Sequence, residues 1–262
     1  MSDPMGDLHV RSVQRFGWIP DVPDNRDQLF SAPGAVMTNL PQKVDLRQQC
    51  PVVYDQGQLG SCTANAIGAA FEFDQLKQGL ADFIPSRLFI YYNERTIEGT
   101  VASDSGAMIR DGMKSVNKLG VCPETEWTYD ITKFRDKPAD QCYTDAAKHQ
   151  ALVYRSVVQD LHQIQACLAS GYPVVFGFSV YESFETQEVA SSGVVPLPKK
   201  GEKQLGGHAV LAVGYDDTAQ SFIVRNSWGP SWGQGGYFTM PYAYATSGQL
   251  ASDFWALYTV EQ

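Results

Sequence analysis

The sequence predicts an α+β protein in which a helical lobe precedes a lobe of antiparallel strands. Helical spacing of hydrophobic residues dominates residues 62–120, whereas short apolar runs of strand length follow residue 150. The chain has 262 residues, 44% of them hydrophobic and 19% charged, which suits one two-lobed globular domain. We place this domain at residues 42–262, with the helical lobe at about 55–150 and the β lobe at about 151–262.

Residues 1–41 form an N-terminal arm. They hold five of the fourteen prolines and show no sustained helical or strand period. Such a segment lies on a body rather than forming a domain, and Trp18 and Phe30 would pin it there by burying aromatic area. The first twenty residues contain no apolar run of signal-peptide length. The chain is therefore either cytoplasmic, or a signal has been removed from it.

Three helices are predicted in the first half. The first starts near Cys62, because the apolar residues that follow recur at mostly three- and four-residue spacing. Gly79 would end this helix, and Ser61 is the candidate for its N-cap. Similar patterns predict helices over residues 85–95 and 108–119.

The second half predicts an antiparallel sheet or partial barrel. The turn residues 216–218 separate two of its strands, which should pair as a hairpin. The predicted strands cover residues 174–180, 208–215, 221–225, 235–240 and 254–260.

Composition excludes several kinds of function. The chain carries 20 basic and 29 acidic residues, a formal charge of −9, and an acidic surface repels the phosphates of nucleic acids. No apolar run approaches the roughly 18 residues of a membrane span. The four histidines show no metal-ligand spacing, and neither CxxC nor HExxH occurs. We expect no nucleic-acid partner, no metal and no cofactor.

Cys62 is the first candidate for chemistry. It follows the segment 56–61 and opens the predicted helix, where the positive end of the helix dipole favours a thiolate. A buried structural cysteine is an equally good interpretation of this position alone.

His208 and Asn226 decide between these interpretations. His208 opens one predicted strand and Asn226 ends the next, so an antiparallel hairpin would place them side by side. An asparagine oxygen that binds one imidazole nitrogen fixes the tautomer and aims the other nitrogen outward. With Cys62, these residues would form a nucleophile, its base and the group that orients the base.

The motifs around these residues resemble those of the papain and cathepsin family of cysteine peptidases. The segments 56–62, 208–210 and 226–229 match the nucleophile, histidine and asparagine motifs in order, and the 146-residue spacing from Cys62 to His208 agrees with the family signature. The match runs from about Val44 to the C-terminus. It implies a papain-like two-lobed fold, with a helical left lobe, an antiparallel β-barrel-like right lobe and the active site in the cleft between them.

The resemblance also implies a role for each residue. Cys62 would be the nucleophile, His208 its base and later acid, and Asn226 the residue that orients the histidine. The Gln56 side chain and the Cys62 backbone N–H would form the oxyanion hole. Trp228 and Ser227 would support the site, Trp228 by covering the histidine–asparagine hydrogen bond. The residues expected to bind substrate are Ser105, Gly106, Phe178, Ser179 and Gly207.

The cysteines show where the chain departs from the family. Leu59 replaces a cysteine that usually lies three residues before the nucleophile, and Thr63 replaces the usual aromatic residue after it. The four cysteines other than Cys62 can pair in three ways, and Cys122 with Cys142 is one candidate disulfide because both flank a Pro-rich loop. A disulfide suits an oxidising compartment, so we expect a secreted or cell-envelope protein, with the cytoplasm as the alternative.

We therefore expect a monomeric cysteine endopeptidase that forms a thioester at Cys62. Its partners would be protein or peptide substrates and proteinaceous cysteine-peptidase inhibitors. A thiol acyltransferase or deamidase, an exopeptidase and an inactive binding module remain alternatives. The arm resembles the N-terminal extensions of bacterial papain-like proteins, and it would either restrain access to the cleft or strap the body passively.

Overall fold

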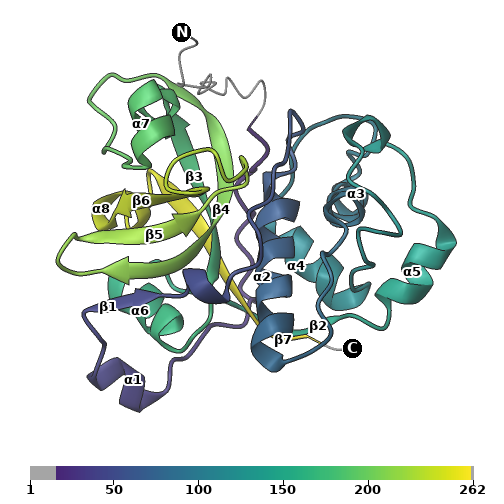
Figure 1. Cartoon of the computed structure of the whole chain (residues 1–262), viewed down its shortest axis with the longest axis horizontal. Coiled ribbons are helices and arrows are strands. Elements are labelled where there is room, and N and C mark those ends of the chain that lie inside the picture. Colours follow the sequence, from purple (N-terminus) through teal and green to yellow (C-terminus); the bar gives the residue numbers. More distant parts are fainter. Residues whose placement is uncertain (1–15, 261–262) are drawn as a thin grey trace, which may run out of the picture.

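A helical lobe and a sheet lobe meet along helix α2 (Cys62–Gln78) in the computed structural model (Figure 1). The structure describes residues 16–260, so the first fifteen residues of the predicted arm lie outside the described residues, as do the last two of the chain. The other helices are α1 (Gly34–Thr38), α3 (Arg87–Glu98), α4 (Ile109–Lys118), α5 (Asp140–Ala146), α6 (Leu161–Ala169), α7 (Gln187–Ser192) and α8 (Tyr242–Ala245). The strands are β1 (Lys43–Asp45), β2 (Ala151–Ser156), β3 (Val174–Tyr181), β4 (Gln204–Asp216), β5 (Ser221–Arg225), β6 (Tyr237–Pro241) and β7 (Ala251–Val260).

The strands form one antiparallel sheet. Its order is β2-β7-β3-β4-β5-β6, and β1 also pairs with β4. The predicted hairpin of β4 and β5 is confirmed, with Leu211 opposite Arg225. This architecture confirms the α+β class and the predicted order of a helical lobe followed by a lobe of antiparallel strands.

Helix α2 forms the centre of the molecule because it is buried on all sides. Every residue from Cys62 to Gln75 is buried, as expected for a helix inside a core rather than on a surface. It packs on α3 and α4 in one lobe and on β3, β4 and β7 in the other. The N-terminus of α2 therefore lies at the junction of the two lobes.

The three predicted helices are confirmed with small shifts at their ends. Helix α2 starts at Cys62 and ends before Gly79, whose φ of 66° is left-handed. Helix α3 starts at Arg87, because the Ser86 hydroxyl caps it by accepting a hydrogen bond from the Phe89 N–H. Ser61 occupies the predicted N-cap position of α2, but its hydroxyl makes no capping hydrogen bond and lies 2.5 Å from the Tyr129 hydroxyl.

Two strands begin at other residues than the sequence predicts. β4 begins at Gln204 rather than His208, because residues 204–207 pair with β3 before β5 begins. β6 begins at Tyr237 rather than Gly235, because the two preceding glycines have left-handed φ values of 69° and 90°. The short helix α1 in the arm, strand β2 and helix α6 were not predicted from the sequence.

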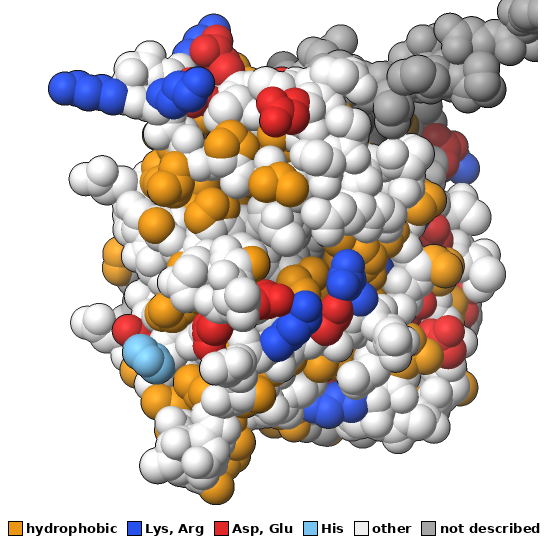
Figure 2. Space-filling model, turned by 60° about the vertical axis from the view of Figure 1, so that its left-hand side comes forward, with side chains coloured by type: hydrophobic (Ala, Val, Ile, Leu, Met, Phe, Trp, Pro, Cys, Tyr) orange, Lys and Arg blue, Asp and Glu red, His pale blue; other side chains and the backbone are white. Residues whose placement is uncertain are grey.

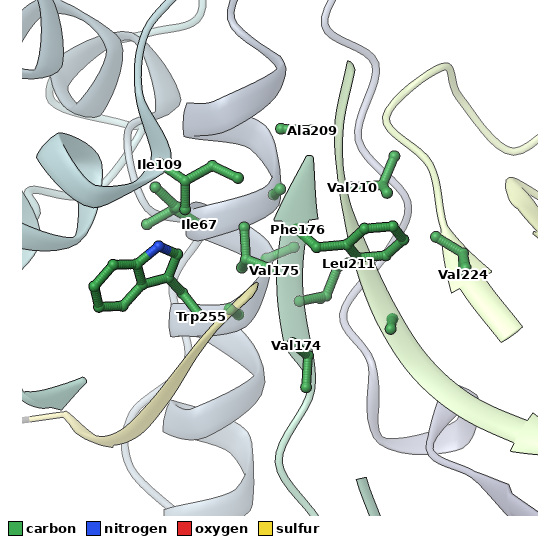
Figure 3. Packing of buried hydrophobic residues seen from close by; sticks show 14 of the residues in the cluster. Ile67, Ile109, Val174, Val175, Phe176, Ala209, Val210, Leu211, Val224 and Trp255 are labelled. Carbon is green, nitrogen blue, oxygen red and sulfur yellow. The ribbon is translucent and has the colours of Figure 1, made fainter. Parts of the chain in front are cut away.

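Both lobes contribute to one hydrophobic core. Figure 3 shows Ile67 of α2 and Ile109 of α4 close to Trp255 of β7, beside Val175 of β3. The arm joins this core through Trp18 and Phe30, each only 8% exposed. The burial expected of these two aromatic side chains is confirmed.

The surface carries charges of both signs. On the face in Figure 2, acidic and basic side chains are interspersed among hydrophobic and uncharged ones. No helix within residues 16–260 is long and apolar enough to cross a membrane.

Candidate active site

Cys62 lies at the junction of the lobes, where α2 begins. Its side chain is fully buried, and the backbone N–H groups of Ala209 on β4 and Gly17 in the arm face its sulfur. Burial raises the pKa of the thiol to about 12, outweighing these N–H groups, which lower it. The sequence predicts a thiolate favoured by the helix N-terminus, whereas burial at this position acts in the opposite direction on the pKa of the thiol.

His208 is held by Asn226 from the end of β5. The His208 Nε2 and the Asn226 Oδ1 are 2.8 Å apart, and both side chains are buried. The Ser227 N–H donates to the same Oδ1 at 2.8 Å, which fixes the amide with its oxygen toward the ring. Nδ1 of His208 is then the nitrogen left to serve the thiol.

Aromatic rings cover the histidine–asparagine hydrogen bond. The Trp228 ring lies 5.0 Å from the His208 ring, at an interplanar angle of 30°. Phe178 approaches His208 edge-on, at 5.8 Å. Water excluded by these rings cannot compete for the hydrogen bond, so they preserve the orientation of the imidazole.

Gln56 is fixed beside Cys62 by both ends of its amide. Its Oε1 accepts from the Ser227 hydroxyl at 2.6 Å, and its Nε2 donates to the Leu59 carbonyl at 2.9 Å. The amide has a second N–H, which is available to a developing oxyanion. Ser227 thereby positions two site residues, since its backbone binds Asn226 and its hydroxyl binds Gln56.

The arm runs between the two lobes (Figure 1) and forms hydrogen bonds with both. The Trp18 N–H donates to the Gly207 carbonyl at 2.9 Å in the β lobe. On the other wall, the Ala107 N–H donates to the Gly17 carbonyl at 2.8 Å, and the Ile19 N–H donates to the Ala107 carbonyl at 3.0 Å. A Cβ on Gly17 would overlap the Gly60 carbonyl, so only glycine fits at this point of the arm.

Trp18 fills a pocket that two glycines create. A Cβ on Gly177 or on Gly207 would overlap the Trp18 ring. The Trp18 Nε1 donates to Asp253 Oδ2 at 3.0 Å, and this oxygen also accepts from the Asp21 N–H at 2.8 Å. A groove of about 350 Å³ borders the ring, with Ser179 and Gly206 among its lining residues.

Asp21 anchors the arm where it leaves the cleft. Its carboxylate accepts from the Arg110 N–H at 3.0 Å and from the Trp255 Nε1 at 2.9 Å. Burial, and next the nearby Asp253, raise the pKa of Asp21 to about 7.

The predicted substrate-binding residues divide into three groups. Gly207 and Ser179 border the arm, and Gly106 lies beside Ala107 with the Gly17 carbonyl close to it. The Ser105 hydroxyl bonds to the neighbouring Gly106 carbonyl. Phe178, in contrast, is fully buried behind His208, because its side chain faces the core rather than the cleft.

Sequence reasoning missed Ala107 and Asp253. Ala107 acts through its backbone, which carries no sequence signal. Asp253 directly precedes the predicted strand 254–260, and in the structure it lies inside β7, which begins three residues earlier than predicted.

One group of metal-binding residue types lies close together within the described part of the chain. The ligand atoms of Cys122, Glu126 and Cys142 lie within 4.8 Å of one another. Both cysteines are buried, and Glu126 is exposed. All five cysteines carry free thiols in the structure, so the candidate disulfide is not present in it.

The site combines a buried thiol, a histidine held by an asparagine, and a fixed glutamine, and it lies between a helical and a β lobe. This arrangement is typical of a thiol-dependent hydrolase. A sequence profile for the papain family of cysteine proteases matches residues 40–256, and the chain belongs to that family.

Similar proteins cover most of the chain. Xylellain, a cysteine protease from Xylella fastidiosa of solved structure, matches with a TM-score of 0.88 and 50% identity, over 94% of this chain and 96% of its own. An uncharacterized peptidase C1-like protein of Acanthamoeba polyphaga mimivirus is 44% identical over 94% of this chain and 88% of its own length. A cathepsin B-like protein of Giardia intestinalis is 31% identical over 80% of this chain and 73% of its own length.

Replacing Gln56 by alanine is expected to lower kcat/KM for peptide hydrolysis by about 10²- to 10³-fold, because an oxyanion donor is lost. Gln58→Ala is the matched control in the same loop, where Gln58 is exposed, and should leave kcat/KM unchanged. Hydrolysis of a fluorogenic peptide measures both variants, and thermal unfolding verifies that they fold. An unchanged kcat/KM for Gln56→Ala would show that Gln56 does not act as an oxyanion donor.

Proposed function

We propose that the chain is a cysteine endopeptidase that hydrolyses peptide bonds through a thioester at Cys62. The observation that carries this proposal is the 2.8 Å hydrogen bond from His208 Nε2 to Asn226, beside the thiol at the start of α2. His208 Nδ1 takes the thiol proton while the sulfur attacks the carbonyl carbon, and the imidazolium then protonates the departing amine. Water activated by the same nitrogen cleaves the thioester and restores the thiol.

The oxyanion of each tetrahedral intermediate requires donors that are already in place. The Gln56 amide and the Cys62 backbone N–H supply them in the proposed mechanism. The Ser227 and Leu59 contacts hold the Gln56 amide before substrate arrives, so little reorganisation accompanies the reaction.

Other uses of the same thiol are less well supported. An acyltransferase or deamidase would share every step up to the thioester and would differ in the acceptor or the leaving group. An inactive binding module would have no need of Cys62, His208, Asn226 and Gln56 together.

An exopeptidase would need a group that anchors a terminal charge. The described histidines other than His208 are His149, whose ring lies 4.7 Å from the Phe83 ring at an angle of 58°, and His162, which lies on α6. These positions favour an endopeptidase.

We also propose that the arm restrains access to the cleft rather than strapping the body passively. The Gly17 N–H faces the Cys62 sulfur, whereas the Gly17 carbonyl is bound to Ala107. The arm therefore covers the nucleophile without presenting a carbonyl carbon for attack. Trp18 adds to the restraint by filling the adjoining pocket.

The remaining proposals concern the setting of the enzyme. We propose a bacterial, monomeric enzyme of the cell envelope or the secreted space, acting on proteins or peptides and inhibited by proteinaceous cysteine-peptidase inhibitors. The similarity to xylellain supports the bacterial origin. The closeness of Cys122 and Cys142 supports a disulfide in that compartment, formed by exchange with a disulfide oxidant that accepts their two electrons.

An epoxide inhibitor of cysteine peptidases is expected to label the protein once, at Cys62, and to stop peptide hydrolysis in parallel. Cys62→Ala should abolish both labelling and hydrolysis, whereas Cys167→Ala, which removes another buried thiol, should retain both. Mass spectrometry locates the adduct. Labelling that persists in Cys62→Ala would refute the mechanism, and cleavage of internal bonds in a peptide library would separate endopeptidase from exopeptidase activity.

Gly17→Ala is expected to displace the arm, and so to increase both peptide hydrolysis and the rate of Cys62 labelling severalfold. The new methyl group collides with the Gly60 backbone. Gly34→Ala is the matched control in the same arm, because its Cβ would meet open space, and it should behave as the unaltered chain. Equal rates for both variants would favour the passive strap.

If Cys122 and Cys142 form a disulfide, protein purified without reductant and alkylated after denaturation should gain three adducts rather than five, since two of the five cysteines are then protected. Prior reduction should raise the number to five. Five adducts without reduction would contradict the disulfide.

A further inference from the structure

Two buried cysteines and a glutamate lie together on the outer side of the helical lobe, where α5 is located (Figure 1). Cys122 lies in the loop after α4, Glu126 lies four residues further on, and Cys142 lies on α5. The two sulfurs and a carboxylate oxygen of Glu126 all lie within 4.8 Å of one another. Cys122 is 0% exposed and Cys142 is 2% exposed, whereas Glu126 is exposed. The cluster therefore has two ligand types of metal sites inside the protein and a third at the surface.

The loop that carries Cys122 and Glu126 is held against the start of α3. The Ser86 N–H donates to the Cys122 carbonyl at 2.8 Å, and the Glu124 N–H donates to the Ile84 carbonyl at 2.8 Å. The carboxylate of Glu124 also accepts two hydrogen bonds of 2.8 Å from the Arg87 guanidinium. Two of the three side chains in the cluster are therefore positioned by a loop that is already fixed.

Helix α5 is attached to the rest of the lobe by fewer contacts. It has only seven residues, and a helix of that length is marginal without tertiary support. Its buried residues are Cys142 and Ala146, which form with Cys122 and Phe89 a hydrophobic cluster distinct from the main core. The Tyr143 hydroxyl adds a hydrogen bond of 3.1 Å to Oδ1 of Asn93. A cross-link between Cys142 and the loop would therefore strengthen a small interface.

The three side chains of the cluster are ligands that Zn²⁺ prefers. Thiolates select zinc over the hard cations Mg²⁺ and Ca²⁺, and a carboxylate completes many zinc sites. With Zn–S bonds of about 2.3 Å, two sulfurs of a tetrahedral site lie about 3.8 Å apart. Atoms that already lie within 4.8 Å of one another need to approach by about 1 Å or less to reach this geometry. Because Glu126 is exposed, water can occupy the fourth position on its side.

The charges around the cluster suit a divalent cation. Two thiolates and the Glu126 carboxylate carry three negative charges, of which Zn²⁺ neutralises two. Lys148 Nζ lies 2.5 Å from Asp145 Oδ1, and the charges of both residues act on Glu126. Lys148 therefore offsets the carboxylate nearest to the site, and the net charge of the cluster with Zn²⁺ bound is small.

We propose that Cys122, Cys142 and Glu126 bind one Zn²⁺ while both thiols are reduced, and that the ion fastens α5 to the loop of residues 122–126. Two S–Zn bonds and one O–Zn bond form, the two thiol protons pass to solvent, and no electron is transferred. The disulfide proposed above and the bound ion exclude each other, because each uses both sulfurs. The two cysteines are too far apart in the chain for the common zinc motifs, so the sequence predicts no metal.

The test titrates the full chain with Co²⁺ and Zn²⁺. The chain carries Cys62→Ala, so that the thiol at the start of α2 cannot bind metal, and it is reduced with a phosphine that is then removed without air. We expect one equivalent of Co²⁺ to produce sulfur-to-cobalt charge-transfer absorption, which Zn²⁺ abolishes by displacing Co²⁺. Competition with a chromophoric chelator should give a Kd for Zn²⁺ below about 1 μM. Mg²⁺ and Ca²⁺ should not compete.

Four variants of this chain identify the ligands. Cys122→Ser and Cys142→Ser should each abolish the charge-transfer absorption and weaken Zn²⁺ binding at least 100-fold, roughly the upper end of the loss seen when metal-site residues are changed. Cys50→Ser, which changes a thiol outside the cluster, should bind as the parent chain does. Glu126→Gln should weaken Zn²⁺ binding about tenfold.

Two controls keep the result independent of folding and of surface charge. Asp140→Asn removes an exposed carboxylate of α5 and should leave the Kd for Zn²⁺ unchanged. Stoichiometric Zn²⁺ should raise the Tm of the parent chain, because a ligand that binds only the folded state stabilises it, and this measurement needs no change in the cluster.

Two results would overturn the site. One is the absence of charge-transfer absorption together with an unchanged Tm in the reduced parent chain. The other is a Zn²⁺ affinity that stays the same in folded Cys122→Ser and Cys142→Ser, or for which Mg²⁺ and Ca²⁺ compete, since binding would then be by surface carboxylates. Neither result bears on peptide hydrolysis at Cys62, which the unaltered chain tests separately.

Discussion

The packing of α2 against the sheet is the constraint on which the rest of the structure depends. The helix is buried from Cys62 to Gln75, so its axis cannot move relative to β4 and β7 without opening the core. That packing places the proposed nucleophile, Cys62 of α2, next to the proposed base, His208 of β4. The core therefore fixes the geometry of the candidate site.

The polar groups at this junction act as one connected network. Asn226 orients His208, the Ser227 N–H fixes the Asn226 amide, and the Ser227 hydroxyl fixes Gln56. The backbone N–H of Gln56 also donates a hydrogen bond to the backbone carbonyl of Ser227 at 2.9 Å, and this bond joins the two lobes directly. The two proposed functions, orientation of the general base and stabilisation of the oxyanion, are therefore coupled through Ser227, and a change at that residue would affect both.

The sequence predicts what short segments encode. The helix beginning at Cys62 and the hairpin of β4 and β5 follow from local periodicity, and the three motifs supply the candidate residues of the site. It does not predict what long-range contacts decide. Burial raises the pKa of the Cys62 thiol, and the groups that oppose this effect include the Gly17 N–H, 45 residues away in the chain. The Ser61 hydroxyl contacts Tyr129, 68 residues away, instead of capping α2. Ala107 binds the arm through backbone groups that any residue possesses, so its contribution has no signature in the sequence.

The covalent link between the arm and the body changes how its few contacts act. Backbone hydrogen bonds, the Trp18 indole and the Phe16 ring near His208 hold the segment in the cleft, and a free peptide making the same contacts would bind weakly. Tethering converts the association into an intramolecular step, with an effective concentration in the millimolar range for short flexible linkers. Occupation of the cleft is then independent of protein concentration and persists on dilution. A single cut in the chain between the arm and α2 would abolish that advantage and make release of the arm irreversible.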